Sequence, residues 1–169
     1  YGEWAQLEVD LMLRLVTLGD VVGDAGACIG TRALAFSSAG VAVHAFEAHP
    51  WHAELLRRNV ARNGADAIKV HAVGLSDVAG TIHMKSDGGA DGQLNYGGAR
   101  FESGSGGRGC IAVSTVRIDD LGLSACRLLK IDVEGMEGAV LAGAARTLAV
   151  LRPLAYVECN SVNEGDRKS

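Results

Sequence analysis

A glycine-rich turn follows the first short apolar run of this sequence, and an acid opens it. Asp24 comes soon after the apolar residues 21–22, and Gly26 and Gly30 follow it. Glycine permits the tight turn and the close backbone approach that a bound ligand needs. The turn has neither the lysine of a phosphate-binding loop nor the G-x-G-x-x-G spacing of a dinucleotide fingerprint. Because an acid here would repel a pyrophosphate, the turn favours a ligand with a positive group and no phosphate at this point, such as S-adenosylmethionine.

A second acid, Glu47, follows the apolar segment 41–46. A carboxylate at this place can accept both hydroxyls of a ribose. Enzymes that use NAD share this feature with enzymes that use S-adenosylmethionine, so Glu47 indicates an adenosine ligand rather than a particular one. On its own Glu47 is equally well explained as a solvated acid at the end of a strand, but the glycine turn before it favours the ligand.

Two more acids, Asp132 and Glu134, follow the apolar segment LLKI. If the strand extends through 128–133, side chains alternate and both acids project to one side. Burying two such acids without partners is costly, so they are candidates for holding a cation or activating a hydroxyl. Glu134 has a second interpretation, as a favourable charge at the start of a helix that begins near Met136. No histidine-rich ligand set accompanies the pair, and no metal is expected.

Further polar candidates follow the third strand and flank the third helix. Ser76 and Asp77 could form hydrogen bonds with the adenine edge, although Ser-Asp followed by Gly80 is also a sequence typical of a turn.

His49 and His52 lie near the start of a helix and are alternative candidates for the catalytic base. The other strand histidines, at positions 44 and 71, are expected to be core or sheet-face residues.

Helices and strands that alternate along the chain must position these residues. Helices are expected at 4–16, 31–38, 50–62 and 136–150, with a short turn or helix at 119–121. Strands are expected from 21 and at 41–46, 67–75, 81–84, 110–116, 128–133 and 154–159. This order predicts an α/β fold, a Rossmann-like, doubly wound and mostly parallel sheet with helices on both faces. Ligands bind such sheets beyond the carboxyl ends of the strands, where the acids fall.

Composition narrows the possible partners. The chain has 169 residues and a formal net charge of −4, and its 48% hydrophobic content fits one domain spanning 1–169, with an N-terminal helix within 1–18. Its basic residues are scattered, whereas nucleic acids and anionic membranes select for clusters of them. Neither is therefore an expected partner. Four cysteines without metal-binding spacing predict free thiols and a cytoplasmic location.

Between residues 20 and 160 the chain contains, in this order, the segments VVGDAGACIGT, AFEAHP, ELLRRNVARNG, VGLSD, LNYGGAR, KIDVEGME and RPLAYVE. Together these segments resemble the FkbM family of S-adenosylmethionine-dependent methyltransferases. The resemblance implies the class I methyltransferase fold and O-methylation of a small molecule such as a sugar or polyketide. It places Asp24, Gly26, Ala27 and Gly30 on the methionine side of the cofactor, Glu47 at the ribose, Ser76 and Asp77 at the adenine, and Asp132 near the reacting methyl.

The resemblance also sets expectations for the rest of the chain. The class I fold usually ends with a further helix and an antiparallel strand pair, and only 161–169 remain here, so that strand pair is expected to be missing. A second copy or a partner domain could cover the exposed sheet edge. The segment 87–109 contains nine glycines and is expected to be a lid, with Asn95 and Arg100 touching the acceptor.

A hydroxyl is a poor nucleophile at neutral pH, and a base near it contributes about 10²–10⁴-fold to the rate. Asp132 or Glu134 is the expected base. A catalytically silent cofactor-binding module, or a truncated domain, is the alternative in a different class. An NAD-dependent oxidoreductase would explain Glu47, but it leaves the failed G-x-G-x-x-G spacing unexplained.

Overall fold

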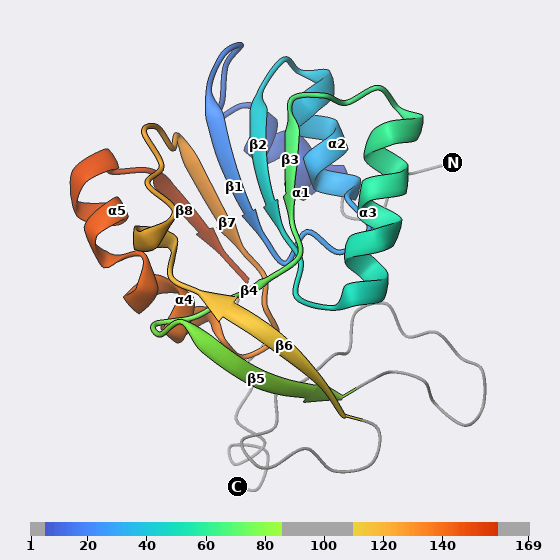
Figure 1. Cartoon of the computed structure of the whole chain (residues 1–169). Coiled ribbons are helices and arrows are strands. Elements are labelled where there is room, and N and C mark those ends of the chain that lie inside the picture. Colours follow the sequence, from blue (N-terminus) through green and yellow to red (C-terminus); the bar gives the residue numbers. More distant parts are fainter. Residues whose placement is uncertain (1–5, 86–109, 159–169) are drawn as a thin grey trace, which may run out of the picture.

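A parallel five-stranded sheet forms the centre of the molecule, in a computed structural model that describes residues 6–85 and 110–158. The strands are β1 (Val21–Ala25), β2 (Ala42–Phe46), β3 (Ile68–His71), β7 (Leu128–Ile131) and β8 (Leu154–Val157), in the order β3-β2-β1-β7-β8 (Figure 1). All four neighbouring pairs are parallel. The strand order reverses between β1 and β7, which is the usual place of a ligand site in such a sheet. The predicted α/β fold with a parallel sheet is confirmed.

Helices cover both faces of this sheet, as Figure 1 shows. One face carries α1 (Gln6–Leu13), α2 (Thr31–Ser38) and α3 (Pro50–Arg62), and the other carries the short helix η1 (Ile118–Asp120), α4 (Glu137–Gly143) and α5 (Ala145–Leu151). Alternate residues of the strands therefore enter two separate cores. Val43 and Leu128 belong to the core under α1–α3, whereas Phe46 and Ile131 belong to the core under α4 and α5.

Local signals at its two ends fix α3 as the sequence predicts. His49 caps its start, since Nδ1 of His49 accepts a hydrogen bond from Trp51 N at 3.3 Å. Pro50 occupies the first turn, where its missing N–H costs nothing. Asn63 ends the helix, and Gly64 follows with a φ of 57°.

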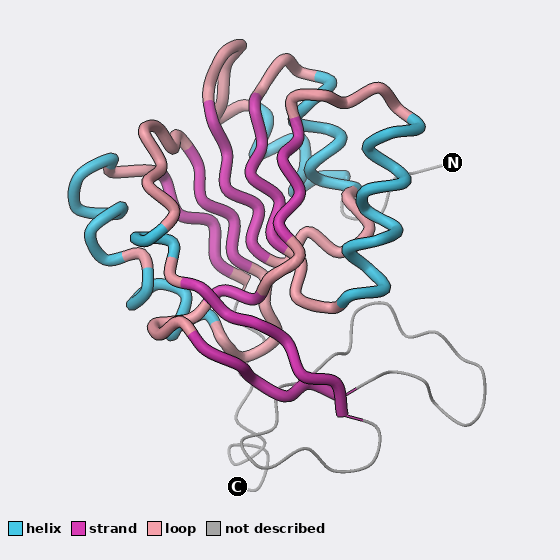
Figure 2. The backbone as a smooth tube through the Cα atoms, in the orientation of Figure 1, coloured by secondary structure: helices cyan, strands magenta, loops and turns pink. Residues whose placement is uncertain are grey.

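A second, three-stranded sheet lies at the end of the main sheet toward which its strands point (Figures 1 and 2). It consists of β4 (Gly74–Leu75), β5 (Gly80–Lys85) and β6 (Cys110–Val116), in the order β4-β6-β5. β5 and β6 pair in antiparallel fashion, and β4 pairs in parallel with the end of β6. The segment expected as one strand over 67–75 is thus divided between two sheets, which corrects the sequence prediction.

The helix expected over 136–150 is also divided, with its break at Ala144 (φ −108°, ψ 8°). The carboxylate of Asp119 explains the break. It accepts hydrogen bonds from Arg146 N at 2.9 Å and Thr147 N at 2.8 Å, and so caps α5 from a distant part of the chain. Among the helices of the described residues, none is long and apolar enough to cross a membrane.

Candidate functional site

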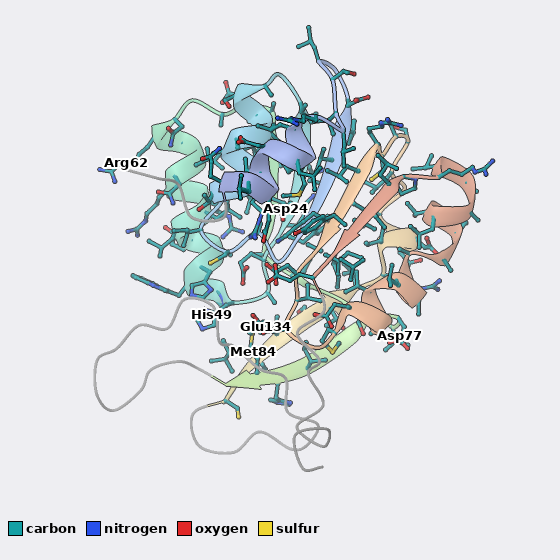
Figure 3. The ribbon with its side chains drawn as sticks, turned by 180° about the vertical axis from the view of Figure 1, so that it is seen from behind. Asp24, His49, Arg62, Asp77, Met84 and Glu134 are labelled. Atoms are coloured by element: carbon teal, nitrogen blue, oxygen red, sulfur yellow. The ribbon has the colours of Figure 1, made fainter. Side chains whose placement is uncertain are left out.

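A cavity of about 530 Å³ opens at the carboxyl ends of the main strands, beside the switch in strand order. Residues that follow β1, β2, β7 and β8 line it, together with apolar residues of the second sheet. The predicted site residues in its wall are Asp24, Gly26, Ala27, Glu47, Asp132 and Glu134. Figure 3 shows Asp24 inside the molecule, Met84 on the second sheet and Glu134 beside that sheet.

Asp24 and Lys130 are buried together at the base of the cavity, and both have no exposed surface. Lys130 Nζ lies 3.0 Å from Asp24 Oδ1, and it donates hydrogen bonds to Ala25 O at 3.2 Å and Gly26 O at 2.9 Å. The contact with Asp24 is electrostatic. Neither oxygen of Asp24 has a hydrogen-bond partner of good geometry in the described part of the chain. A buried carboxylate in this state has unused capacity to accept hydrogen bonds from a ligand.

The glycine turn after β1 passes directly over the end of β7. Gly26 has a φ of 77°, and a Cβ atom there would lie 1.8 Å from Asp132 O. The amides of Gly26 and Ala27 both donate to Phe46 O at 3.0 Å. The sequence therefore needs glycine at position 26, because a side chain would push the turn away from β7. Gly30 is outside the cavity wall, where it caps α2 with a φ of 97°.

Glu47 is buried and held by two backbone amides. Its Oε2 accepts from Cys28 N at 2.8 Å, and its Oε1 accepts from His49 N at 2.7 Å. Burial raises the pKa of Glu47, although these two hydrogen bonds oppose the shift. Since each carboxylate oxygen can accept more than one hydrogen bond, the fixed carboxylate can still receive ligand hydroxyls.

Asp132 follows β7, which β1 separates from the strand of Glu47, and it lies within a cluster of charges. Arg32, in the first turn of α2, places Nη1 3.5 Å from Asp132 Oδ2. Arg32 Nη2 lies 3.0 Å from Glu8 Oε2 and 3.8 Å from Glu158 Oε2. Lys130 Nζ is 3.6 Å from Asp132 Oδ2. Arg32 thus connects α1, α2 and the ends of β7 and β8.

Glu134 does not continue the strand. β7 ends at Ile131, and Glu134 has a left-handed φ of 51°. The expectation that Asp132 and Glu134 project from one extended strand is therefore wrong, although both line the cavity. At the start of α4 it is Glu137 whose Oε1 accepts a hydrogen bond from Gly135 N, at 2.9 Å.

Ser76 and Asp77 lie outside the cavity wall, where they form a turn. Ser76 Oγ donates to Asp77 Oδ1 at 3.1 Å, and Ser76 N donates to Val116 O at 3.0 Å. Figure 3 shows Asp77 apart from Asp24 and Glu134, on the side of α4. Val73, Gly74 and Leu75 line the cavity instead.

The two helix histidines lie near Glu47. His52 Nδ1 is 3.8 Å from Glu47 Oε1, and its ring centroid is 4.6 Å from that of His49. Asn95 and Arg100, predicted to touch the acceptor, lie outside the described residues. Within residues 6–85 and 110–158, no three or more His, Cys, Asp and Glu side chains gather in a way that would hold a metal ion.

Glu158 is a site residue that sequence reasoning missed. It follows β8 and lines the cavity beside Asp132. The signal was present, because Glu158 is an acid after an apolar run, like Asp24 and Glu47. The strand was expected to run through 154–159, which placed Glu158 inside it.

Comparisons with known proteins identify the family of the chain and its fold. The sequence profile of the methyltransferase FkbM domain matches residues 24–168. The chain is similar in structure to methyltransferase FkbM from Methylobacillus flagellatus KT, with a TM-score of 0.59 and 20% identity over 82% of this chain and 32% of that one. It is also similar to a Streptococcus mutans protein assigned as a methyltransferase, in complex with SAH, with a TM-score of 0.53 and 10% identity over 89% of this chain and 68% of that one.

At these identities the two structures show the fold of the chain. The chain spans about a third of the length of the Methylobacillus protein. No curated protein gives a significant match.

Proposed function

The chain belongs to the FkbM methyltransferase family, and from this premise we propose that it binds S-adenosylmethionine and transfers the methyl group to a hydroxyl of a small molecule. One observation carries the proposal. Asp24 is a fully buried acid in the wall of the cavity, and among the described residues it lacks a hydrogen-bond partner of good geometry. A ligand that brings a positive group and hydrogen-bond donors would supply the hydrogen bonds that Asp24 lacks.

The residues around the glycine turn fit the proposed cofactor. Asp24, Gly26 and Ala27 would hold its methionine part, and Glu47, fixed by Cys28 N and His49 N, would receive the ribose hydroxyls. Gly30 supports this turn from the start of α2, and Ser76 and Asp77 stay a prediction for the adenine side.

The charge of the cavity supports the same cofactor. Its described lining residues include five carboxylates. They also include two basic side chains, those of Arg32 and Lys130, besides His52. A net negative wall attracts a ligand that carries a sulfonium and an ammonium, and it repels a pyrophosphate. This balance favours S-adenosylmethionine over NAD.

Methyl transfer needs an acceptor oxygen that is aligned with the methyl group and that can lose its proton. When bound, the cofactor supplies a methyl group activated by its sulfonium. We assign Asp132 and Glu134 to the acceptor hydroxyl, because both line the cavity after the end of β7. Apolar walls from Leu75, Met84 and Val133 suit the carbon skeleton of a small acceptor such as a sugar or polyketide.

Other parts of the proposal rest on the sequence. They are a single domain over 1–169, contact of Asn95 and Arg100 with the acceptor, and a second copy or partner domain along β8. Asn95 and Arg100 lie within 87–109, outside the described residues. Among the described strands of the main sheet, β8 lies at one edge.

The Asp132→Asn variant tests the proposed chemistry. The protein is incubated with S-adenosylmethionine and a panel of hydroxylated sugars and polyketide fragments, and methylated products are detected by mass spectrometry. We expect Asp132→Asn to reduce turnover by about 10²-fold or more, since it removes a carboxylate at the hydroxyl. Its affinity for S-adenosylhomocysteine should change much less.

Asp66→Asn is the matched control, because Asp66 is exposed and outside the cavity wall. It should keep wild-type turnover. Wild-type protein that binds the cofactor and methylates no acceptor would favour the catalytically silent module. Undiminished turnover in Asp132→Asn would contradict the role given to Asp132.

A further inference from the structure

Glu158 and Asp132 occupy equivalent places at the ends of two neighbouring parallel strands. Ile131 pairs with Val157, so the next residues along the two strands are Asp132 and Glu158. Glu158 N donates to Ile131 O at 2.9 Å, which continues the parallel ladder to this point. Neighbouring residues of a parallel ladder project to the same side of the sheet. The two carboxyl groups therefore face the cavity together.

Arg32, in the first turn of α2, contacts both members of this pair. Its Nη1 contacts Asp132 at 3.5 Å, and its Nη2 lies 3.8 Å from Glu158. Glu8 of α1 holds the same Nη2 atom at 3.0 Å. With the guanidinium held on three sides, the two carboxyl groups are kept close together in spite of their charge.

The two carboxyl groups differ in how they are engaged. Asp132 Oδ2 is held by both Arg32 and Lys130. Glu158 Oε2 is shielded from solvent and accepts no hydrogen bond of good geometry from the residues that the structure describes, and Arg32 Nη2 lies 3.8 Å from it. Glu158 as a whole keeps contact with solvent, since 32% of its side-chain surface is exposed. Glu158 therefore has an oxygen available for a ligand proton and a route by which a proton can leave.

The surroundings of Glu158 favour its protonated form. Burial is the largest cause of its raised pKa, and the charge of Asp132 raises the pKa further. The charge of Arg32 lowers it. The charge of Glu8 on α1 and a side-chain hydrogen bond with Asp132 also raise the pKa of Glu158. The charge of Glu158 in turn raises the pKa of Tyr156 on β8. A base whose pKa is raised toward neutral is better matched to a hydroxyl proton than an ordinary carboxylate.

We propose that Glu158 is the general base of the methyl transfer, and that Asp132, held by Arg32 and Lys130, orients the acceptor hydroxyl toward it. This inference rests on the proposed function and specifies which carboxylate takes the proton. The acceptor O–H bond breaks and its proton passes to Glu158 Oε2. The electron pair left on the acceptor oxygen forms the new O–C bond with the methyl group. The electrons of the S–C bond stay on sulfur, which gives S-adenosylhomocysteine. Glu158 then returns the proton to solvent.

A pair of ligands tests the position of Glu158 without any acceptor. Sinefungin carries an ammonium where S-adenosylmethionine carries the reacting methyl, and S-adenosylhomocysteine carries no group there. Titration calorimetry of both ligands on the wild type and on Glu158→Gln measures the preference for the ammonium. The variant removes a carboxylate close to the ammonium, so we expect this preference to fall by about tenfold or more. The affinity for S-adenosylhomocysteine should be unchanged.

Glu54→Gln is the matched control, since Glu54 lies on α3, pairs with Arg58 and does not line the cavity. It should keep the wild-type preference, and Glu158→Asp, which keeps the charge, should retain part of it. An equal preference in wild type and Glu158→Gln, with S-adenosylhomocysteine still bound, overturns the role of Glu158 alone. Wild-type protein that binds neither ligand contradicts the proposed function and this inference together.

Discussion

Asp24 and Lys130 lie side by side in the interior, an arrangement whose desolvation cost must be offset by contacts. The 3.0 Å contact with Asp24 provides one of them, and the carbonyls of Ala25 and Gly26 provide two hydrogen bonds. Lys130 thereby fixes both the acid and the turn that follows it. A buried charge held so firmly is prepared for a ligand, since binding requires little rearrangement.

A stack of three rings on β2 and β3 predicts acid sensitivity of the fold. His71 pairs with Phe46 across the two strands, with ring centroids 4.5 Å apart, and His44 Nδ1 is 3.1 Å from His71 Nε2. Burial, followed by the charges of His44 and Lys69, lowers the pKa of His71 from 6.5 to about 4. Because folding depresses this pKa, protonation opposes folding. The stabilising effect of neutral His71 is present above pH 6.5 and is lost as the pH falls toward 4.

The His71→Phe variant checks this at the same position, since it keeps a ring against Phe46 and removes the titrating group. Melting temperatures are measured between pH 8 and pH 4 for the wild type and the variant. We expect the melting temperature of the wild type to fall by a few degrees more than that of the variant over this range. Parallel curves for the two proteins would contradict the assignment.

The sequence predicts most of the acids of the site by one rule, that an acid follows an apolar run. It does not predict their exact positions. Asp24, Glu47 and Asp132 each come after an apolar run and all line the cavity. The orientation expected for Glu134 was wrong and Glu158 was missed, because both depend on where a strand ends. β7 and β8 end at Ile131 and Val157, two residues earlier than expected in each case. Hydrogen-bonded pairing of the backbone determines where these strands end, and the types of the side chains do not reveal this pairing.

At the scale of elements, the turn after β1 must approach the end of β7, and Gly26 makes this possible. Its φ is 77°, and a Cβ would meet Asp132 O at 1.8 Å. We expect Gly26→Ala to displace the turn, to lower the free energy of unfolding by about 3 kcal/mol or more and to abolish binding of S-adenosylhomocysteine. Chemical denaturation and calorimetry measure the two effects.

Gly19→Ala is the matched control for backbone strain, since Gly19 has a φ of 87° and no atom within 4 Å of its Cβ position. It should cost about 1–2 kcal/mol and leave the affinity unchanged. Equal effects of the two substitutions would show that strain alone matters, against the close approach described here.

Elements with local signals were predictable, and elements fixed by distant contacts were not. Pro50 and Asn63 mark the two ends of α3 in the sequence itself. By contrast, the break between α4 and α5 depends on Asp119, which reaches Arg146 and Thr147 from a separate segment. The second sheet likewise depends on pairing between β4 and β6, which lie far apart in the chain.

At the scale of the whole molecule, every part of the candidate site lies at one end of the main sheet. The glycine turn, Glu47, Asp132 and Glu158 come from four different strand ends, and the second sheet adds apolar walls beside them. The chain spans about a third of the Methylobacillus methyltransferase that it resembles. Because Asp24, Glu47 and the glycine turn meet in one cavity, cofactor binding is the activity that this arrangement supports most directly.

Calorimetric titration with S-adenosylhomocysteine, with NAD⁺ as the competing ligand, tests that claim on the wild type and on Glu47→Gln. The account predicts that the folded wild type binds S-adenosylhomocysteine and does not bind NAD⁺. It also predicts that Glu47→Gln weakens this binding by about tenfold or more, because the ribose loses a charged acceptor. Binding of NAD⁺, or failure of the folded wild type to bind S-adenosylhomocysteine, would contradict it.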